Sequence, residues 1–543
     1  MIRNKAILVF SISGLFLFLF LNKNFESQKT ALFLSKKIPA PVISATFLKS
    51  NAVKYFVPKN NLYKVQYISF NHKRLDTVYA ESNSWIDELS KQNYWMVNEM
   101  ASYKQRAPIN QFNEAGTMCA RYVNTQTNEY GPWTYFTAIQ KKPTMPVVSL
   151  LINPTSFFDF YKGIYTAGIS QITIDSLAFK GSGWWLNPGN WLNKGKEWER
   201  PVTFQYLSQT GNIAFTSNAG VRINGNATRG FSQKSLRLLA SKKYGNKVFE
   251  YDFFDGSNSA KYKSLILRNS GNDWGKTMFA DAFIQSCVSD SVIDKQAYKS
   301  VLLYINGIYW GIYGLCERLD EDIIAQRYSI KKSKITILEG ELLSAGEESD
   351  KQDYLKIVHT SKHINGKNEK WYDALCSEID IHNFCTYTAI QLYIANTDLH
   401  AQNIKKFRIE NSKWKWLLRD LDCSYSYSGN ESFKLDMFET LMRSKSDLGI
   451  IFNACMHQPS FRKTLLLSME YLLSNGFAIN NQLAKLNAYK NLYEAEMPMQ
   501  VARWRKPASL NDWNNSINAF ENFIKNREKV VRLQMKKYLE AND

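Results

Sequence analysis

The sequence predicts an α+β protein with a β-rich half first and a helical half after it, preceded by a small β-sandwich module. Two observations support this order. Strand-like runs separated by turn residues extend to about residue 345, and from about residue 350 the apolar residues recur with helical spacing. The 543 residues are 45% hydrophobic and 22% charged, which is normal for a globular protein and excludes a largely disordered chain.

The first residues have the order of a secretory signal. Arg3 and Lys5 precede an apolar run over 6–21, AILVFSISGLFLFLFL. A helix of this length spans about 24 Å, less than the roughly 30 Å hydrocarbon core of a membrane. The residues that follow offer no small-x-small cleavage site, so residues 1–23 are either a signal peptide or an uncleaved membrane anchor. In both cases we expect the rest of the chain to lie outside the cytoplasm.

Four segments follow the predicted signal or anchor. Residues 61–145 contain short aromatic and β-branched runs, which predict the small β-sandwich. Within the next segment, KTMFADAFIQSCVSD predicts one amphipathic helix, and Asn306-Gly307 predicts a tight hairpin turn. The segments are a linker at 24–60, the β-sandwich module at 61–145, a β-rich lobe with a Trp-rich insertion at 146–345, and a helical lobe at 346–543.

The net charge indicates which partners to expect, and the spacing of the cysteines argues against two kinds of site. The 68 Lys and Arg against 49 Asp and Glu give a net charge of +19, which favours polyanions such as nucleotides, acidic polysaccharides or an anionic membrane surface. No block of Lys and Arg resembles a nucleic-acid-binding arm, so we expect no nucleic-acid partner. The seven cysteines are scattered without a CxxC pair, which argues against a zinc ribbon or a thioredoxin-like site.

The residues most informative about chemistry follow a long helical run. Asp398 and Asn403 stand in a D-x-x-x-x-N arrangement, and Asp420 and Asp422 end the strand-like run KWKWLLRD. Phosphoryl transfer needs a carboxylate that takes or orients the proton of the acceptor hydroxyl, and an Asn and an Asp that hold Mg²⁺ against the phosphates. The alternative reading is that these aspartates only terminate a helix and form a turn after a strand.

An upstream hairpin offers groups that suit phosphates. Gly225 and Gly230 bracket a polar turn whose backbone N–H groups can approach a phosphate, with Lys234 placed to reach it and Arg229 as a second cation. Such a lobe also needs an acidic helix residue to orient the lysine, and carboxylates beyond the hairpin for ribose or adenine. Ordinary surface and linker residues are the alternative for these candidates, which are Asp281 for the helix and Glu317 and Asp320 for the linker.

Several of these segments resemble the CotH (spore-coat-protein-H-like) kinase family. The resemblance is carried by GVRINGNATRGFSQKSLRLLA, YKSLILRNSGNDW, LLYINGIYWGIYGLCERLD, NTDLHAQNIKKFRI and WKWLLRDLDCSY, and it covers roughly residues 146–540. The preceding MCARYVNTQTNEYGPWTYFTA is similar to a chitobiase-type β module. The resemblance implies a bilobal, atypical protein-kinase-like fold that binds ATP with Mg²⁺ or Mn²⁺ and phosphorylates Ser or Thr of secreted or surface proteins.

The resemblance also implies roles for individual residues. Asp398 would be the catalytic aspartate, Asn403 a metal ligand, and Lys234 the phosphate-binding lysine. Asp420 would be the main metal-binding aspartate, with Asp422 as a second ligand. The chain has NTD where ordinary kinases have HRD, DLD in place of DFG, and no GxGxxG loop.

A second class of function also fits the sequence. The same scaffold fits a non-catalytic surface or matrix protein that binds glycans or proteins, with the Trp-rich GWWLNPGNW stacking on sugars. The combination of Asp398, Asn403, Asp420 and Lys234 favours the enzyme, because a binding scaffold has no need of all four residues.

Overall fold

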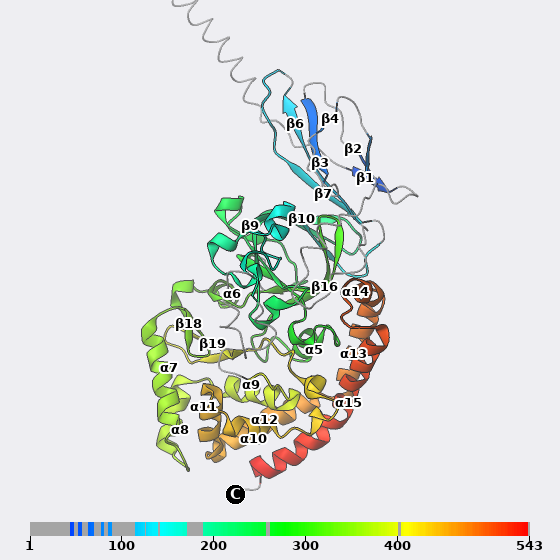
Figure 1. Ribbon diagram of the computed structural model, residues 1–543. Coiled ribbons are helices and arrows are strands. Elements are labelled where there is room, and N and C mark those ends of the chain that lie inside the picture. The colour runs from blue at the N-terminus through cyan, green and yellow to red at the C-terminus, as the bar shows by residue number, and fades with distance from the viewer. Residues whose placement is uncertain are drawn as a thin grey trace, which may run out of the picture. The chain divides into compact units, whose positions relative to one another are not determined.

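Figure 1 shows a computed structural model of the chain. It describes five short strands before residue 89 and then residues 115–540, except residues 125, 140–141, 171–187, 257–260 and 400–402. The chain divides into two compact units, residues 1–91 with 117–138, and residues 92–116 with 139–543. The predicted signal or anchor at 1–23 lies outside the described residues. Among the described residues, no helix is long and apolar enough to cross a membrane.

The first unit contains two small sheets, in which the pairs β1-β2, β2-β5, β3-β4 and β3-β6 are antiparallel. One has the strand order β1-β2-β5 and the other β4-β3-β6-β7. Two of these strands lie within the segment predicted as a linker. That the other strands form the predicted β-sandwich and chitobiase-type module stays a prediction. The strands are β1 (Ser44–Phe47), β2 (Val53–Phe56), β3 (Tyr63–Ser69), β4 (Val78–Ala80), β5 (Trp85–Glu88), β6 (Ala115–Asn124) and β7 (Thr134–Ile139).

The second unit begins with a closed β-barrel. Neighbouring strands are antiparallel except β8 and β15, which are parallel and adjacent in the ring. The predicted hairpin at Asn306-Gly307 is confirmed, because both residues have positive φ (50° and 79°) between β15 and β16. In spatial order the strands are β10 (Ile213–Ile223), β11 (Leu236–Leu239), β14 (Ser264–Arg268), β16 (Ile308–Glu317), β15 (Tyr298–Ile305), β8 (Val147–Leu151) and β9 (Arg200–Leu207).

Helices dominate after the barrel, as the change of periodicity predicts, so the mixed α+β prediction is confirmed. The segment predicted as helical also contains β19 and β20, which complete a sheet of order β18-β17-β19-β20. The strands are β17 (Ile335–Glu339), β18 (Leu342–Ala345), β19 (Lys405–Ile409) and β20 (Lys415–Leu417). The helices are α6 (Glu321–Arg327), α7 (Glu348–Ser361), α8 (Glu369–Glu378), α9 (Ile381–Ile394), α10 (Met437–Arg443), α11 (Asp447–Met456), α12 (Pro459–Ser474), α13 (Ile479–Glu494), α14 (Met497–Trp504) and α15 (Leu510–Met535).

Two hydrophobic cores correspond to these two halves. The barrel encloses one core that includes Phe204, Leu265 and Trp310. The helices enclose the other, and this core also takes Phe283 from α5 (Ala280–Ser286). Helix α5 lies between barrel strands in the chain but packs into the helical core, which brings its polar residues to the place where the two halves meet. Further short elements are α3 (Pro154–Phe158), β12 (Phe249–Glu250) and β13 (Lys261–Tyr262).

The last helices connect the two halves. Trp504, at the end of α14, donates its indole N–H to the backbone oxygen of Trp310 on β16 at 2.7 Å. Arg527 on α15 donates to the backbone oxygens of Leu392 (2.5 Å) and Tyr393 (2.8 Å). These two oxygens belong to the last turn of α9, where a helix leaves carbonyl groups without helical partners. Figure 1 shows α13 to α15 passing from the level of β16 along the helical half.

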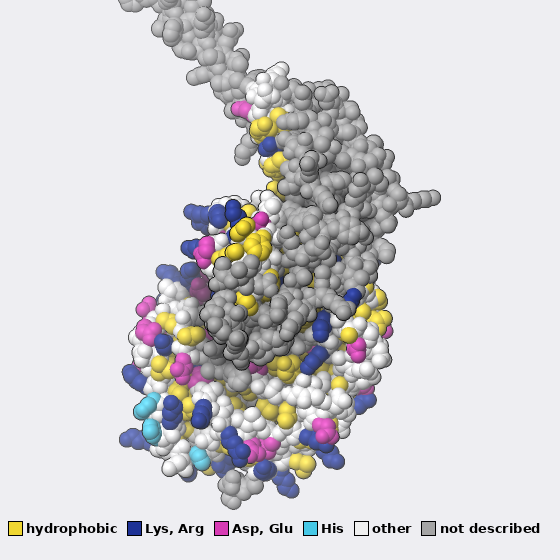
Figure 2. All heavy atoms as spheres, in the orientation of Figure 1, with side chains coloured by type: hydrophobic (Ala, Val, Ile, Leu, Met, Phe, Trp, Pro, Cys, Tyr) yellow, Lys and Arg dark blue, Asp and Glu magenta, His cyan; other side chains and the backbone are white. Residues whose placement is uncertain are grey.

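Figure 2 shows how the charged residues are distributed over one face of the molecule. On the face shown in Figure 2, Lys and Arg side chains are interspersed with acidic, polar and hydrophobic ones. This agrees with the absence of a basic block in the sequence.

Candidate active site

The centre of the candidate site is Arg268, the last residue of β14. Its Nη2 lies 2.6 Å from Oδ1 of Asp420 and also contacts Oδ2 of Asp422. Its Nε lies 3.6 Å from Oδ2 of Asp281 on α5. One barrel strand, one helix and the segment after β20 therefore converge on a single guanidinium group, whose five N–H donors suit several carboxylates.

The two aspartates after β20 have different surroundings. The Asp420 side chain is 28% exposed and that of Asp422 only 2%. Burial raises the pKa of Asp420, but the charges of Arg268 and Arg419 outweigh burial and hold that pKa below its ordinary value. Burial, with the charges of Asp420 and Asp281, raises the pKa of Asp422 to about 7 against the opposing effect of Arg268. Asp420 is therefore the ionised and more accessible carboxylate.

Asp422 instead fixes the loop that follows β14. It accepts hydrogen bonds from the backbone N–H of Asn272 (3.0 Å) and from its side-chain amide (3.2 Å). Gly271 has φ of 59°, and a Cβ atom there would lie 1.8 Å from Oδ2 of Asp422. Only glycine accepts both this backbone conformation and this close approach. Asp420 has φ of 60°, a left-handed conformation that costs a non-glycine residue about 1–2 kcal/mol.

Asp398 and Asn403 lie on the loop after α9. The side-chain amide of Asn403 donates to Oδ2 of Asp398 at 2.7 Å, and the Asp398 N–H donates to Oδ1 of Asn396 at 3.0 Å. The N–H of Thr397 donates to the backbone oxygen of Cys423 at 3.1 Å. This bond joins the Asp398 loop to the segment that carries Asp420, so the structure brings together the two motifs that the sequence separates.

The donor atoms of this group are of the type that suits a hard divalent cation. Asp398, Asn403 and Asp420 offer carboxylate and amide oxygens, the ligands that Mg²⁺ prefers. The family model described as CotH kinase protein matches residues 221–531, more than half of the chain. The chain belongs to this family. Membership makes it a kinase-like protein. A search of curated proteins found no match.

The structure places Lys234 away from the carboxylates of this CotH-family protein. The residue is 1% exposed, and its ammonium group donates to the backbone oxygens of Arg229 (2.9 Å) and Phe231 (2.8 Å). It also lies 3.9 Å from the centre of the Trp191 ring. Burial and the charge of Arg229 lower the pKa of Lys234. This placement does not agree with the predicted phosphate contact: Lys234 holds the turn between β10 and β11.

Arg229 is also turned into the protein. Its guanidinium donates to the backbone oxygens of Trp191 (2.6 Å), Ile223 (2.7 Å) and Asn193 (2.8 Å), and the residue is 5% exposed. This placement does not favour the second phosphate contact, which stays a prediction. Asp281 keeps the predicted place on a helix, but its cation is Arg268 and not Lys234.

Glu317 and Asp320 have local partners instead of the predicted ribose or adenine role. Glu317 is 1% exposed, contacts Arg327, and accepts the N–H of Ala297 at 2.8 Å. Asp320 caps α6 by accepting the N–H of Ile323 at 3.3 Å. Both contacts follow from burial, because a buried carboxylate needs donors around it.

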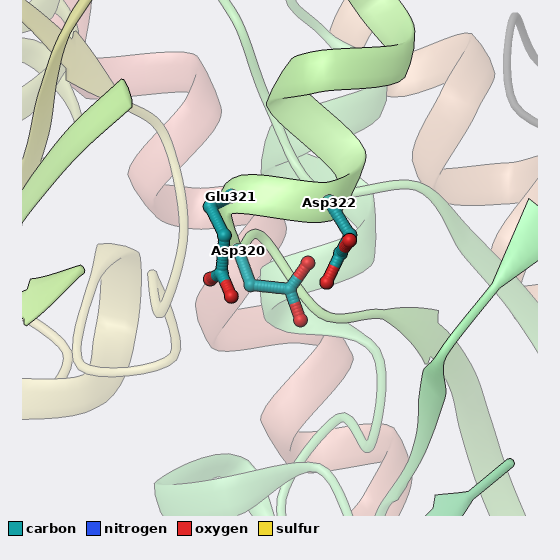
Figure 3. Close-up of side chains that lie close together, drawn as sticks. All are labelled: Asp320, Glu321 and Asp322. Carbon is teal, nitrogen blue, oxygen red and sulfur yellow. The ribbon is translucent and has the colours of Figure 1, made fainter. Parts of the chain in front are cut away.

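Figure 3 shows Asp320, Glu321 and Asp322 together at the first turn of α6. Acidic residues favour this position because a helix N-terminus has exposed N–H groups and a partial positive charge. Arg318 lies 3.5 Å from Asp320, and Lys263 lies 2.7 Å from Asp322. Helix capping and these cations account for the group without a metal ion.

Arg268 is the functional candidate that sequence reasoning missed. It stands in YKSLILRNSGNDW, one of the segments that resemble the family, but no local pattern shows what it faces. The available signal is a cation at the end of a strand, followed by a helix with an early acidic residue.

Proposed function

We propose that this CotH-family protein is a protein kinase that transfers the γ-phosphoryl group of ATP to Ser or Thr side chains of secreted or surface proteins. The observation that carries the proposal is the convergence on Arg268 of Asp281 and Asp420, next to a loop with Asp398 and Asn403. Phosphoryl transfer depends on such positioned charges more than on covalent chemistry by the protein.

Each residue has a defined task in this proposal. Asp398 accepts the proton of the acceptor hydroxyl as its oxygen attacks the γ-phosphorus and the bond to the β–γ bridging oxygen breaks, releasing ADP. Arg268 contacts the phosphates, and Asp281 orients the Arg268 guanidinium. Asn403 and Asp420 would hold the divalent cation, which neutralises phosphate charge when bound. Asp422 orients Arg268 and the loop at Asn272, so we assign it a positioning role and not the second metal contact.

Further cations on the same barrel face support an anionic ligand. Arg222 and Arg237 are direct partners in the β10–β11 register, and Arg237 is opposite Ile266, two residues before Arg268. Glu199 pairs with Arg222. Nε of Arg237 is buried and has no hydrogen-bond partner among the described residues. Like charges directly opposite each other destabilise a sheet, so a bound phosphate chain would relieve this arrangement.

The test is transfer of labelled phosphate from ATP to a Ser-rich acceptor protein with Mg²⁺ or Mn²⁺. Asp398→Asn should abolish transfer. The control Asp373→Asn, which changes an exposed aspartate on α8, should leave it unchanged. Equal labelling by wild type and Asp398→Asn, or none by wild type in either metal, would refute the kinase and favour the binding scaffold.

The place of action is part of the proposal. It rests on the charged and apolar order of residues 1–23, which predicts export with either release or membrane anchoring. Fractionation of cells that make the full chain tests it, and a full-length protein found only in the cytoplasm contradicts it.

A further inference from the structure

A cavity of about 560 Å³ lies beside α5, outside the group of residues assigned to phosphoryl transfer. Its wall is formed by α5, the loop 290–297, the end of β16 and the end of α6. Three aromatic residues, Tyr298, Tyr328 and Tyr489, also line it. A cavity of this size accepts a small organic molecule.

The charged groups of the wall are net acidic. Arg327 contacts Glu317 and lies 3.3 Å from Asp294, so this group has two carboxylates for one guanidinium. Lys295 lies 3.4 Å from Asp290, and its ammonium already donates to two backbone oxygens. Asp255 at the rim is paired with Lys299. One surplus negative charge therefore remains, in a chain whose net charge is +19.

Acidic groups together with aromatic rings suit an organic cation. An ammonium ion gains from carboxylates through charge-assisted hydrogen bonds and from the faces of aromatic rings through cation–π attraction. An anion would be repelled by the surplus carboxylate, and a neutral molecule would gain hydrogen bonds from it but no charge attraction.

The cavity wall is hydrogen-bonded to the residue that orients Arg268. Gln285, which lines the cavity, donates to Oδ1 of Asp281 at 2.9 Å and accepts the N–H of Gln296 at 2.9 Å. Gln296 in turn donates to the backbone oxygen of Glu317 at 2.6 Å. Oδ1 of Asp281 also accepts the N–H of Leu421, between the two aspartates after β20, at 3.2 Å.

The contact between Asp281 and Arg268 is not fully closed. Oδ2 of Asp281 and Nε of Arg268 are 3.6 Å apart, and both are buried without a hydrogen-bond partner among the residues that the structure describes. An N–H···O hydrogen bond is typically about 3.0 Å long, so a shift of roughly 0.6 Å would satisfy both atoms.

We propose that this cavity binds a small organic ammonium ion, and that its occupation moves Gln285 so that Asp281 closes onto Arg268. The binding stands on the cavity itself. The consequence, tighter binding of the phosphoryl donor, rests on the proposed function. The protein would then respond to an organic cation at a site separate from its nucleotide.

Calorimetric titration of the full chain with putrescine tests the binding, with 1,4-butanediol as a neutral molecule of the same length. We expect saturable putrescine binding, at least tenfold weaker butanediol binding, and an at least tenfold loss with Asp294→Asn. If that variant does not fold, Ser286→Lys, which adds a competing ammonium to the wall, should give the same loss. Asp373→Asn is the control and should bind putrescine like wild type. No saturable binding, equal binding of both molecules, or unchanged affinity in the cavity variants overturns the site.

Titration of Mg²⁺–ATP with and without saturating putrescine tests the coupling. Putrescine should tighten ATP several-fold, and ATP should tighten putrescine by the same factor, because coupling between two sites is reciprocal. Gln285→Met should retain putrescine binding but lose this factor. ATP binding that putrescine does not change refutes the coupling. Putrescine binding without any ATP binding refutes the proposed function and leaves the cavity site standing.

Discussion

Replacing Arg268 by methionine removes the one cation that three carboxylates share. Methionine fills much of the same volume, so the main change is electrostatic. Asp281, Asp420 and Asp422 are left close together, and each has lost its contact with a guanidinium. The Arg268 side chain is 19% exposed, so water compensates the loss only in part.

The expected cost at pH 7 is about 3 kcal/mol in the free energy of unfolding. Removing one partner of a buried ion pair costs about 3–5 kcal/mol, and we take the lower end because Asp420 is 28% exposed. An exposed arginine gives the matched control. Arg443, 79% exposed and paired with Glu439, should cost less than about 0.5 kcal/mol when changed to methionine.

The cost should also depend on pH. The pKa of Asp422 is about 7 in the folded protein, above the ordinary 3.8. Between these values the folded state binds more protons than the unfolded state, so this carboxyl makes stability fall as pH rises. Arg268 opposes the rise in that pKa and also holds the pKa of Asp420 below its ordinary value. Without Arg268 the pKa of Asp420 rises as well, so a second carboxyl binds protons in the folded state and the fall becomes steeper. The loss in Arg268→Met should therefore be at least about 1 kcal/mol smaller at pH 5 than at pH 7.

Urea denaturation followed by circular dichroism at both pH values measures these differences. A loss within about 0.5 kcal/mol of the Arg443→Met control at pH 7 would show that Arg268 does not hold the carboxylates together. A loss independent of pH would show that the lost contact is apolar packing and not charge.

The other predictions concern the site and its surroundings. Asp398→Asn should abolish transfer but bind Mg²⁺–ATP within about threefold of wild type, whereas Asp420→Asn should weaken metal-dependent ATP binding at least tenfold by calorimetry; equal affinities would remove the metal role from Asp420. Gly271→Ala should lower the free energy of unfolding by more than about 2 kcal/mol, because its Cβ overlaps Asp422; wild-type stability would contradict the close approach. Lys234→Met should change the affinity for ATP less than about twofold, since its ammonium faces the interior; a large loss would restore its predicted phosphate contact.

The sequence predicted those parts of the site in which chemistry and position are local. Asp398 and Asn403 are five residues apart on one loop, and Asp420 ends a strand-like run, so these features together with the upstream lobe suggested a common site. The role of Arg268 depends on carboxylates more than 150 residues later in the chain. No periodicity or turn signal encodes that separation.

Lys234 shows the same limit, because its burial also depends on residues that are distant in the sequence. Its place near a glycine-bracketed turn predicted a phosphate contact, but Trp191 and Tyr165 approach it from the preceding segment and bury it. The family model covers the site without assigning these contacts. The change from strands to helices was predicted correctly, because it depends only on local periodicity.

The contacts made by α14 and α15 have a consequence for how the protein is made. Trp310 and the last turn of α9 are synthesised long before residues 497–535. In the folded protein, however, their backbone oxygens accept hydrogen bonds from Trp504 and Arg527. The loop with Asp398 follows that same turn of α9. Ribosomes release the chain from its N-terminus onward, so the barrel and the α9 turn emerge before the side chains that bond to these oxygens in the folded protein. A polypeptide truncated before residue 497 should therefore be degraded by proteases and should not accumulate as a partly active product.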